Sequence, residues 1–415
     1  MTKLYAPQDS EVPSDDILHL INLSQSGQPF MPRLQLLHWT TSRAFLPWLH
    51  LLLSPSLSDI HIDFNGGRTT PVNVAVVKVL PTTELKHIAF STLHTNAEID
   101  AALLDLVLRT KRLESIYLQQ EANTEDASSP GDGVEDERLG RIELDSLKSI
   151  IIGVKNEIKF LPNFFNGTTL PNVQHIYLKH SGRTEWSDAS DLFGSILRSA
   201  SPSALHTLRY TSHYHGMDIT SARIYQLWSF TALKTLRITS ACGATGCKFF
   251  LSDDDVSTIA FAMPNLVELH LGGAPCDSTS VAVSVDGLAI LAANCIRLAE
   301  LQIHFDTIGF INRALDVSGQ HVGSARLTQN SCQLTQLNVG RIPLGKGMDG
   351  YWTIGTALLQ IFPNLKSIKF YEQAFSLARD WGEVMRIIKV QRNLTDILSS
   401  TMGEPTLVHT PSTST

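Results

Sequence analysis

The sequence predicts an α/β solenoid, in which short helices and parallel strands alternate along one continuous stack. A Leu-x-x-Leu-x-Leu pattern, with other large apolar residues allowed in place of leucine, occurs twice between Ser252 and Ile303. Each copy follows a run whose apolar residues have helical spacing, so the unit is predicted to be a helix that leads into a strand. Neither copy could bury its apolar face alone. A stack of similar units solves this problem, because each unit covers the exposed face of its neighbour.

The pattern recurs twelve times along the 415 residues of the chain. The mean spacing of the copies is about 30 residues, which is typical of the longer leucine-rich repeats. In such an array the strands lie parallel on the concave face of a horseshoe and the helices lie on its convex side. The predicted fold is therefore a leucine-rich-repeat solenoid. The first residues of the twelve copies are Leu34, Leu57, Leu85, Leu113, Leu147, Val173, Leu205, Leu233, Leu266, Leu298, Leu334 and Leu365.

Helical spacing of apolar residues marks several segments between the strands. Ile99 and Leu103 share one helical face, and a second helix is expected to begin at Asp188. A third helix is expected over residues 353–362. A final amphipathic helix over residues 375–398 is expected to cover the last repeat, because a terminal repeat needs a cap.

Three segments fall outside the repeats. Residues 1–30 are expected to form an N-terminal cap or remnant segment, because they hold one possible helix and no repeat. The solenoid is expected to span residues 31–400, with a loop insertion at 121–138 that contains seven acidic residues and one basic residue. So acidic a segment cannot bury enough apolar surface to form a core. The tail, residues 401–415, is rich in Thr, Ser and Pro and is expected to be disordered.

Composition and charge exclude several classes of protein. The net charge of −7 argues against a nucleic-acid or anionic-membrane surface, since both need a basic face. We found no signal peptide and no apolar run near the ~20 residues that a membrane span needs. The five cysteines are an odd number without paired spacings, which favours a reducing compartment. We therefore expect a cytoplasmic or nuclear protein.

One position in each predicted strand is expected to face the concave surface, namely the residue between the second and third apolar positions. The twelve residues form a ladder that would be about 50 Å long: His38, His61, Ala89, Tyr117, Ile151, Tyr177, Arg209, Arg237, His270, Gln302, Asn338 and Lys369. Aromatic and arginine residues carry much of the binding energy in protein interfaces. The candidate protein-binding residues are Tyr117, Tyr177, Arg209, Arg237, His270 and Gln302. The other interpretation is that these side chains are only solvated, because outward positions are commonly polar.

Two fragments carry a more specific signal. Residues 255–271 and 286–303 resemble the cysteine-containing leucine-rich repeats of F-box/LRR proteins, and the second fragment contains Cys295 three residues before Leu298. Cys332 likewise comes just before a strand, two residues ahead of Leu334. In that family the solenoid recruits a protein substrate, and an N-terminal F-box docks the adaptor of a cullin-based ubiquitin ligase. The resemblance therefore implies substrate recognition for a ubiquitin ligase.

The turns before several strands add a second resemblance. Met31-Pro32-Arg33-Leu34 and Phe362-Pro363-Asn364-Leu365 are similar to the corresponding turns of divergent fungal F-box proteins with a ribonuclease-inhibitor-like solenoid. Only Pro13 and Asp16-Ile17-Leu18 resemble the start of an F-box. Because the first repeat begins soon afterwards, the chain has no recognisable F-box. An adaptor would be a partner only if an F-box lies upstream.

Two sets of residues could support other chemistry. The glycine-rich loop at 340–350 follows a predicted strand and precedes a predicted helix, as a phosphate-binding loop does. Position 347 is Gly, however, where a Ser or Thr would bind magnesium. His213 and His215 with Cys242 and Cys247 have spacing too loose to define a tetrahedral zinc site. We predict a non-catalytic protein-interaction module without a metal or cofactor; the alternative is a nucleotide-binding protein or enzyme that uses the loop at 340–350.

Overall fold

The computed structural model describes residues 2–5, 31–40, 52–64, 70–81, 84–94, 97–121, 141–154, 160–181, 186–213, 218–240, 248–272, 283–309, 311, 331–340, 342–344, 347–370 and 375–401. Its strands are β1 Thr2–Tyr5, β2 Leu34–Thr40, β3 Asp59–Asp63, β4 His87–His94, β5 Ser115–Glu121, β6 Ile142–Glu143, β7 Ser149–Val154, β8 Thr168–Thr169, β9 His175–His180, β10 Thr207–Ser212, β11 Asp218–Thr220, β12 Thr235–Ser240, β13 Lys248–Phe250, β14 Glu268–Leu271, β15 Glu300–Gln302, β16 Gln336–Gly340 and β17 Ser367–Phe370. Its helices are α2 Thr70–Val79, α3 Ala97–Arg109, α4 Phe160–Gly167, α5 Trp186–Ser199, α6 Ser221–Ile224, the 3-10 helix η3 Tyr225–Ser229, α7 Asp253–Ala262, α8 Val285–Asn294, α10 Met348–Ile361 and α11 Phe375–Thr401.

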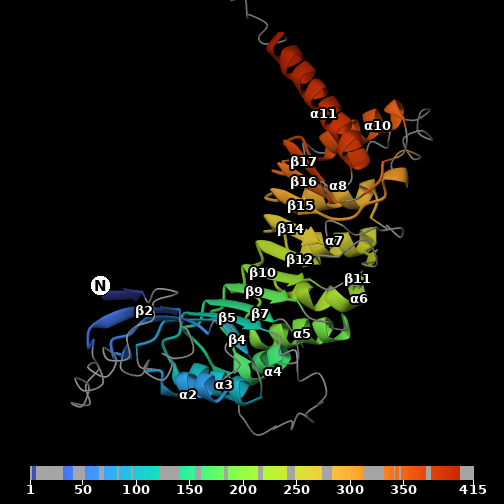
Figure 1. Cartoon of the computed structure of the whole chain (residues 1–415). Helices are drawn as coiled ribbons and strands as arrows, with labels where there is room; N and C mark the ends of the chain where they lie inside the picture. The colour runs from blue at the N-terminus through green and yellow to red at the C-terminus, as the bar shows by residue number, and fades with distance from the viewer. Residues whose placement is uncertain are drawn as a thin grey trace, which may run out of the picture.

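The predicted fold class is confirmed. Thirteen strands form one parallel sheet in the order β1-β2-β3-β4-β5-β7-β9-β10-β12-β14-β15-β16-β17. Figure 1 shows the strands on the inner side of an arc and helices α2 to α10 on its outer side. The chain is thus a leucine-rich-repeat-like solenoid.

The twelve predicted copies coincide with twelve strands of this sheet. β2 begins at Leu34 itself, and each of the other eleven strands begins two residues after the first residue of its copy. All twelve of these first residues are exposed by no more than 2 %. The leucine pattern works as a repeat signal because each copy places the same residues in the core between sheet and helices.

In most repeats a tight turn leads into the strand. The backbone N–H of Leu266 donates to the carbonyl of Met263 at 3.2 Å, and Leu298 donates in the same way to Cys295 at 3.0 Å. The next residues then join the sheet, since the Glu268 N–H donates to the Lys234 carbonyl of the preceding repeat at 3.0 Å. Every repeat is therefore fixed to its neighbour from the first residue of the strand.

The helices cover the other side of the sheet near the predicted places. In α3 both Ile99 and Leu103 are buried, as their spacing predicted. α5 begins two residues before Asp188, and α10 begins at Met348, five residues earlier than expected. α7 has a capping box, in which the Ser252 hydroxyl accepts from the Asp255 N–H and the Asp255 carboxylate accepts from the Ser252 N–H. Such a cap explains where that helix begins.

The long helix α11 lies at the end of the array. Trp381 is fully buried, and its indole Nε1 donates to the carbonyl of Ile342 at 2.9 Å. A Cβ at Gly355 of α10 would stand 3.1 Å from Ile387, so glycine permits the two helices to approach closely. α11 thus covers the last repeat with its first half, while its C-terminal half extends beyond the solenoid (Figure 1).

The first strand, β1, was not predicted. It pairs in parallel with β2 and extends the sheet before the first repeat, although Thr2–Tyr5 carries no leucine pattern. The possible helix at 15–23, almost all of the acidic insertion 121–138 and the tail after Thr401 lie outside the described residues. Within the described part of the chain, no helix combines the length and apolar character needed to cross a membrane.

Candidate functional site

The predicted ladder exists in register. From His38 on β2 to Lys369 on β17, each ladder residue pairs with the next one along the sheet. The rings of His38 and His61 stack with centroids 4.3 Å apart, as in-register neighbours can. The twelve side chains therefore form one continuous row along the concave face.

The middle of this row borders a hollow of about 480 Å³, which we call the central hollow. Four neighbouring strands, β5, β7, β9 and β10, contribute the side chains that define it. Three of the six candidate residues belong to this lining. The defining residues are Tyr117, Ile151, Gly153, Tyr177, Lys179 and Arg209.

The hollow arises from differences in side-chain size on adjacent strands. Gly153 pairs in register with Gln119 on one side and Lys179 on the other. A Cβ added there would approach only Gln119 and the backbone beside it, no closer than 3.8 Å, so the space above Gly153 is open. Ile151 is 37 % exposed between the two larger ladder residues Tyr117 and Tyr177. A partner side chain would find an aliphatic surface there between two aromatic rings.

The polar groups of the central hollow are basic or neutral. The Arg209 guanidinium lies over the Tyr177 ring, 5.3 Å from its centroid, in a cation–π contact. The Tyr117 hydroxyl donates to Gln119 Oε1 at 2.8 Å. Burial, together with the charge of Lys179, lowers the pKa of His213, so that imidazole is neutral at pH 7. Positive charge in the hollow therefore comes from Lys179 and Arg209.

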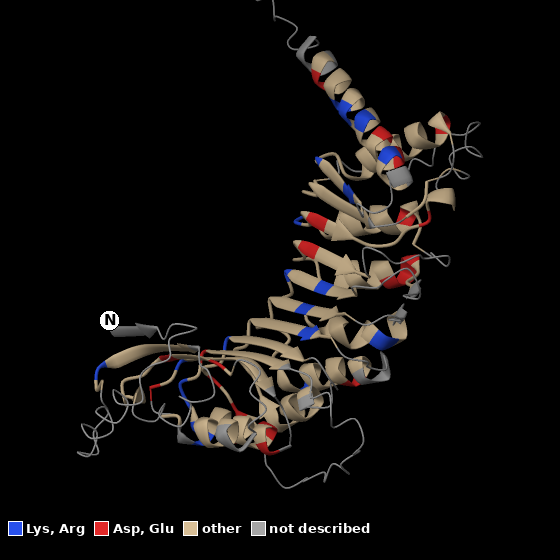
Figure 2. Ribbon diagram, in the orientation of Figure 1, with Lys and Arg blue, Asp and Glu red and all other residues tan. Residues whose placement is uncertain are grey.

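A network of ion pairs lies beside the hollow on the C-terminal side. Glu268 accepts from Arg209 at 3.2 Å and from Arg237 at 2.8 Å, and Arg237 also reaches Glu300 at 3.3 Å. Figure 2 shows the acidic residues of β14 and β15 next to the basic residues of β10 and β12. Arg237 is thus held between two carboxylates. Arg209 shares one of them with Arg237.

Two candidate residues are less accessible than the sequence suggests. His270 is 7 % exposed and Gln302 is 6 % exposed. Gln302 donates to the Gly272 carbonyl at 2.7 Å and accepts from Asn338 at 2.8 Å. These side chains connect neighbouring strands and leave little surface for a partner.

His270 is also uncharged at neutral pH. Burial first and then the charge of Arg237 lower its pKa to about 4. Its Nε2 stands 3.5 Å from Glu300, close enough for an ion pair if the ring were protonated. Because the ring loses its proton far below pH 7, this contact does not act as an ion pair there.

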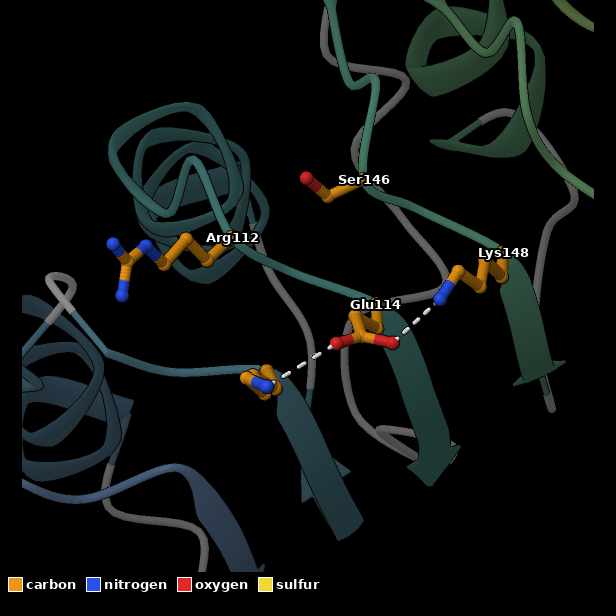
Figure 3. Close-up of a pocket in the computed structure, with 5 residues that line it drawn as sticks. Arg112, Glu114, Ser146 and Lys148 are labelled. Carbon is orange, nitrogen blue, oxygen red and sulfur yellow. Dashed lines mark hydrogen bonds and ion pairs between the residues drawn. The ribbon is translucent and has the colours of Figure 1, made fainter.

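A second, smaller hollow of about 290 Å³ lies at the edge where β4, β5 and β7 begin (Figure 3). Glu114 accepts from Lys148 at 2.8 Å and from Lys86 at 3.5 Å, and the hydrogen bond from Lys148 is the main cause of its lowered pKa. Arg112 pairs with Glu84 at 2.7 Å. The sequence did not single out these residues. Their charges are paired with each other, so this edge has less capacity for an outside ligand than the central hollow.

The described part of the chain gives no support to a phosphate-binding loop at 340–350 or to a zinc site formed by His213, His215, Cys242 and Cys247. In the loop after β16, Ile342 and Leu344 are buried in the core, while Gly345 and Lys346 lie outside the described residues. Gly347, with φ of +123°, leads into α10 in a conformation that favours glycine. His215, Cys242 and Cys247 also lie outside the described residues. Among the residues that the structure describes, no group of three metal-binding side chains comes together.

Comparisons with known proteins give a likeness in fold alone. No protein-family model matches the sequence, and no curated protein matches it. A chain in the crystal structure of the yeast Rad7 and Elc1 complex aligns with a TM-score of 0.42 and 13 % identity, over 82 % of this chain and 70 % of that chain. At such low identity, function has to be argued from the residues of this chain.

Proposed function

We propose that this chain is a non-catalytic protein-interaction module whose partner binds at the central hollow. The observation that carries the proposal is the in-register row of Tyr117, Ile151 and Tyr177, followed by Arg209, on four adjacent strands. The solenoid offers these side chains on a long, open face. Such a face suits an extended partner better than a small substrate.

The residue types in the hollow support binding by a protein. Tyrosine and arginine bury large areas at a modest cost in conformational entropy, and they are enriched among residues that dominate binding energy. Ile151 adds an exposed apolar surface between the two tyrosines. The described residues that line the hollow include neither a carboxylate nor a cysteine. This lining therefore offers neither a carboxylic acid nor a thiol nucleophile.

We further propose that the module recognises a protein substrate for a ubiquitin ligase, as the resemblance to F-box/LRR proteins implies. The two described cysteines support this resemblance because they perform the same structural task in adjacent repeats. Cys295 Sγ donates to the carbonyls of Ala260 at 3.8 Å and Met263 at 3.6 Å. Cys332 Sγ donates to the Cys295 and Leu298 carbonyls, both at 3.8 Å.

These thiols are structural groups. Burial raises the pKa of Cys295 to about 12, with a smaller contribution from Cys332. A thiol that stays protonated at neutral pH is neither a good nucleophile nor a ready metal ligand. The cysteines connect one repeat to the next, as the repeat pattern requires.

A comparison of two alanine variants in an affinity capture tests the proposal. One variant carries Tyr117→Ala, Tyr177→Ala and Arg209→Ala in the hollow. The control carries Tyr225→Ala and Phe261→Ala on η3 and α7, where the side chains are 55 % and 68 % exposed on the helical side. Both variants should keep the circular dichroism of the wild type, because none of the five side chains belongs to the core.

The wild type and the control should retain the same partner protein, and the hollow variant should lose it. Identification by mass spectrometry, followed by reciprocal capture with the purified partner, separates a specific partner from background. Co-recovery of a ubiquitin-ligase adaptor would support the ligase role. Equal retention by the hollow variant and the wild type would contradict the concave-face assignment.

A further inference from the structure

We propose that the central hollow binds a carboxylate side chain in an extended, acidic segment of the partner protein. This inference rests on the proposed function and names the chemistry of the partner. The hollow presents Lys179 and Arg209, whereas the described residues that line it include no Asp or Glu. The complete chain carries a net charge of −7, so this local positive charge is opposite to the overall charge.

Lys179 is the cation that would bind the carboxylate. It is exposed on β9, it lines the hollow, and it has no ion-pair partner among the described residues. Arg209 already shares Glu268 with Arg237 and stacks on Tyr177. Among the described residues beside the hollow, Lys179 is therefore the cation most available to pair with a ligand carboxylate.

The position of Lys179 favours a carboxylate above Gly153. The two residues are register neighbours on adjacent strands, which lie ~4.8 Å apart. An acidic side chain that enters the open space above Gly153 would come within reach of the Lys179 ammonium. A charge-assisted hydrogen bond formed there is stronger than one on an open surface, because the walls of the hollow exclude part of the solvent.

The residues around Gly153 determine which peptide side chains can bind next to the carboxylate. Tyr117 and Tyr177 stand on either side of the exposed Ile151 in the ladder row, next to the row that holds Gly153. An extended peptide that places an acidic side chain over Gly153 brings its neighbouring residues over this apolar surface. The expected motif is an Asp or Glu close to an aliphatic or aromatic residue.

A nucleic-acid strand is the main competing ligand, because aromatic and basic residues also bind single strands. A nucleic-acid strand that ran along the concave face from the hollow would pass Glu268 and Glu300 on β14 and β15. The charges of these carboxylates repel phosphates. The net negative charge of the chain acts in the same direction. A nucleic-acid strand would bring one negative charge per nucleotide past these carboxylates, whereas a peptide needs only the one carboxylate at Lys179, so an acidic peptide is the favoured ligand.

Selection from a phage-displayed library of random linear peptides on the full chain tests the inference. Enriched peptides should contain Asp or Glu next to an apolar residue. For a synthetic peptide from the selection, Lys179→Gln should weaken binding about ten-fold or more, the loss expected for a charge-assisted hydrogen bond. Replacing the acidic residue of the peptide by its amide should have a similar effect, and the two changes together should cost little more than one.

Lys369→Gln is the matched control, because Lys369 is an exposed ladder lysine on β17, far from the hollow. It should leave the affinity unchanged. Failure to enrich any peptide, enrichment of peptides without an acidic residue, or additive losses in the double-substitution experiment would overturn the inference. Binding of a single-stranded oligonucleotide that depends on Lys179 would overturn it as well.

These results also separate the inference from the proposed function. A neutral peptide whose binding is lost in Tyr177→Ala but kept in Lys179→Gln would refute the acidic ligand and leave the concave binding site intact. Peptides that bind independently of both residues would count against both proposals.

Discussion

Replacing Asp100 with asparagine is expected to stabilise the protein at pH 8 and to change little near pH 4. Asp100 lies in the first turn of α3, and its Oδ1 is buried without a hydrogen-bond partner among the described residues. Burial raises the pKa of this carboxyl to about 7 from its ordinary value of 3.8. At pH 8 the folded protein therefore holds a poorly solvated charge that the unfolded chain exposes to water.

The sign and the size of the effect follow from proton linkage. A carboxyl whose pKa is higher in the folded state binds its proton more tightly there, so the stability it contributes is complete below pH 3.8 and is lost as the pH rises to about 7. A shift of about three units corresponds to roughly 4 kcal/mol as an upper limit. The positive end of the α3 dipole stabilises the charged carboxylate by up to about 1 kcal/mol. We therefore expect Asp100→Asn to gain about 2 to 3 kcal/mol at pH 8.

Urea unfolding at the two pH values, followed by circular dichroism, measures this difference. Asp105→Asn is the matched control, because Asp105 is an exposed carboxyl on the same helix that pairs with Arg109 at 2.9 Å. Removal of such a surface pair should change the free energy of unfolding by less than about 1 kcal/mol. Equal unfolding free energies for Asp100→Asn and wild type at pH 8 would refute the reasoning.

Three further predictions concern the core, the concave face and the terminal helix. Leu269→Ala should lower the free energy of unfolding by about 2 to 5 kcal/mol, whereas Phe261→Ala on the exposed side of α7 should change it by less than about 0.5 kcal/mol; equal losses would show that the faces have been assigned wrongly. The folded-state pKa of His270 is depressed to about 4, so its contribution to stability is present above pH 6.5 and is lost as the pH falls to about 4. His270→Gln should flatten that decline in urea titrations, and an unchanged slope between these pH values would contradict the prediction. Trp381→Phe should cost about 1 kcal/mol through the lost hydrogen bond to Ile342, and hydrogen exchange should rise mainly in α11; exchange that rises equally along the solenoid would show that the contact is not local.

The repeat array could be predicted because one physical requirement recurs in every unit. Leu269 and Leu301 are buried by the same sheet-to-helix packing, and their alternation with polar neighbours gives both the strand and its inward face. The register of the ladder followed from the same pattern, because the ladder residue has the same position in every copy. Tyr177 and Arg209 were expected to be neighbours, and they pair directly.

The remaining features depend on neighbours that the repeat pattern does not specify. Alternation predicts the direction in which Gln302 points, but its burial comes from hydrogen bonds to Gly272 and Asn338 in adjacent repeats. The central hollow depends on Gly153. This residue lies outside the ladder row and has no side chain, so the ladder pattern does not indicate it. Asp100 carries no signal in the sequence beyond its place near the start of a helix, and only the packing of α3 buries its Oδ1 and raises the pKa of its carboxyl.

Site-specific photo-crosslinking in the cells that produce the protein tests the central claim most directly. A photoreactive phenylalanine analogue replaces Tyr177 in one variant and Tyr225 in the other, so the two probes match in size and start from the same residue type. Tyr177 borders the central hollow, whereas Tyr225 is 55 % exposed on η3 at the helical side. On irradiation, the probe at position 177 should form a covalent adduct with a partner protein, and the probe at position 225 should form none with that partner. A partner captured from position 225 but not from position 177 would contradict the claim that the concave hollow is the binding site.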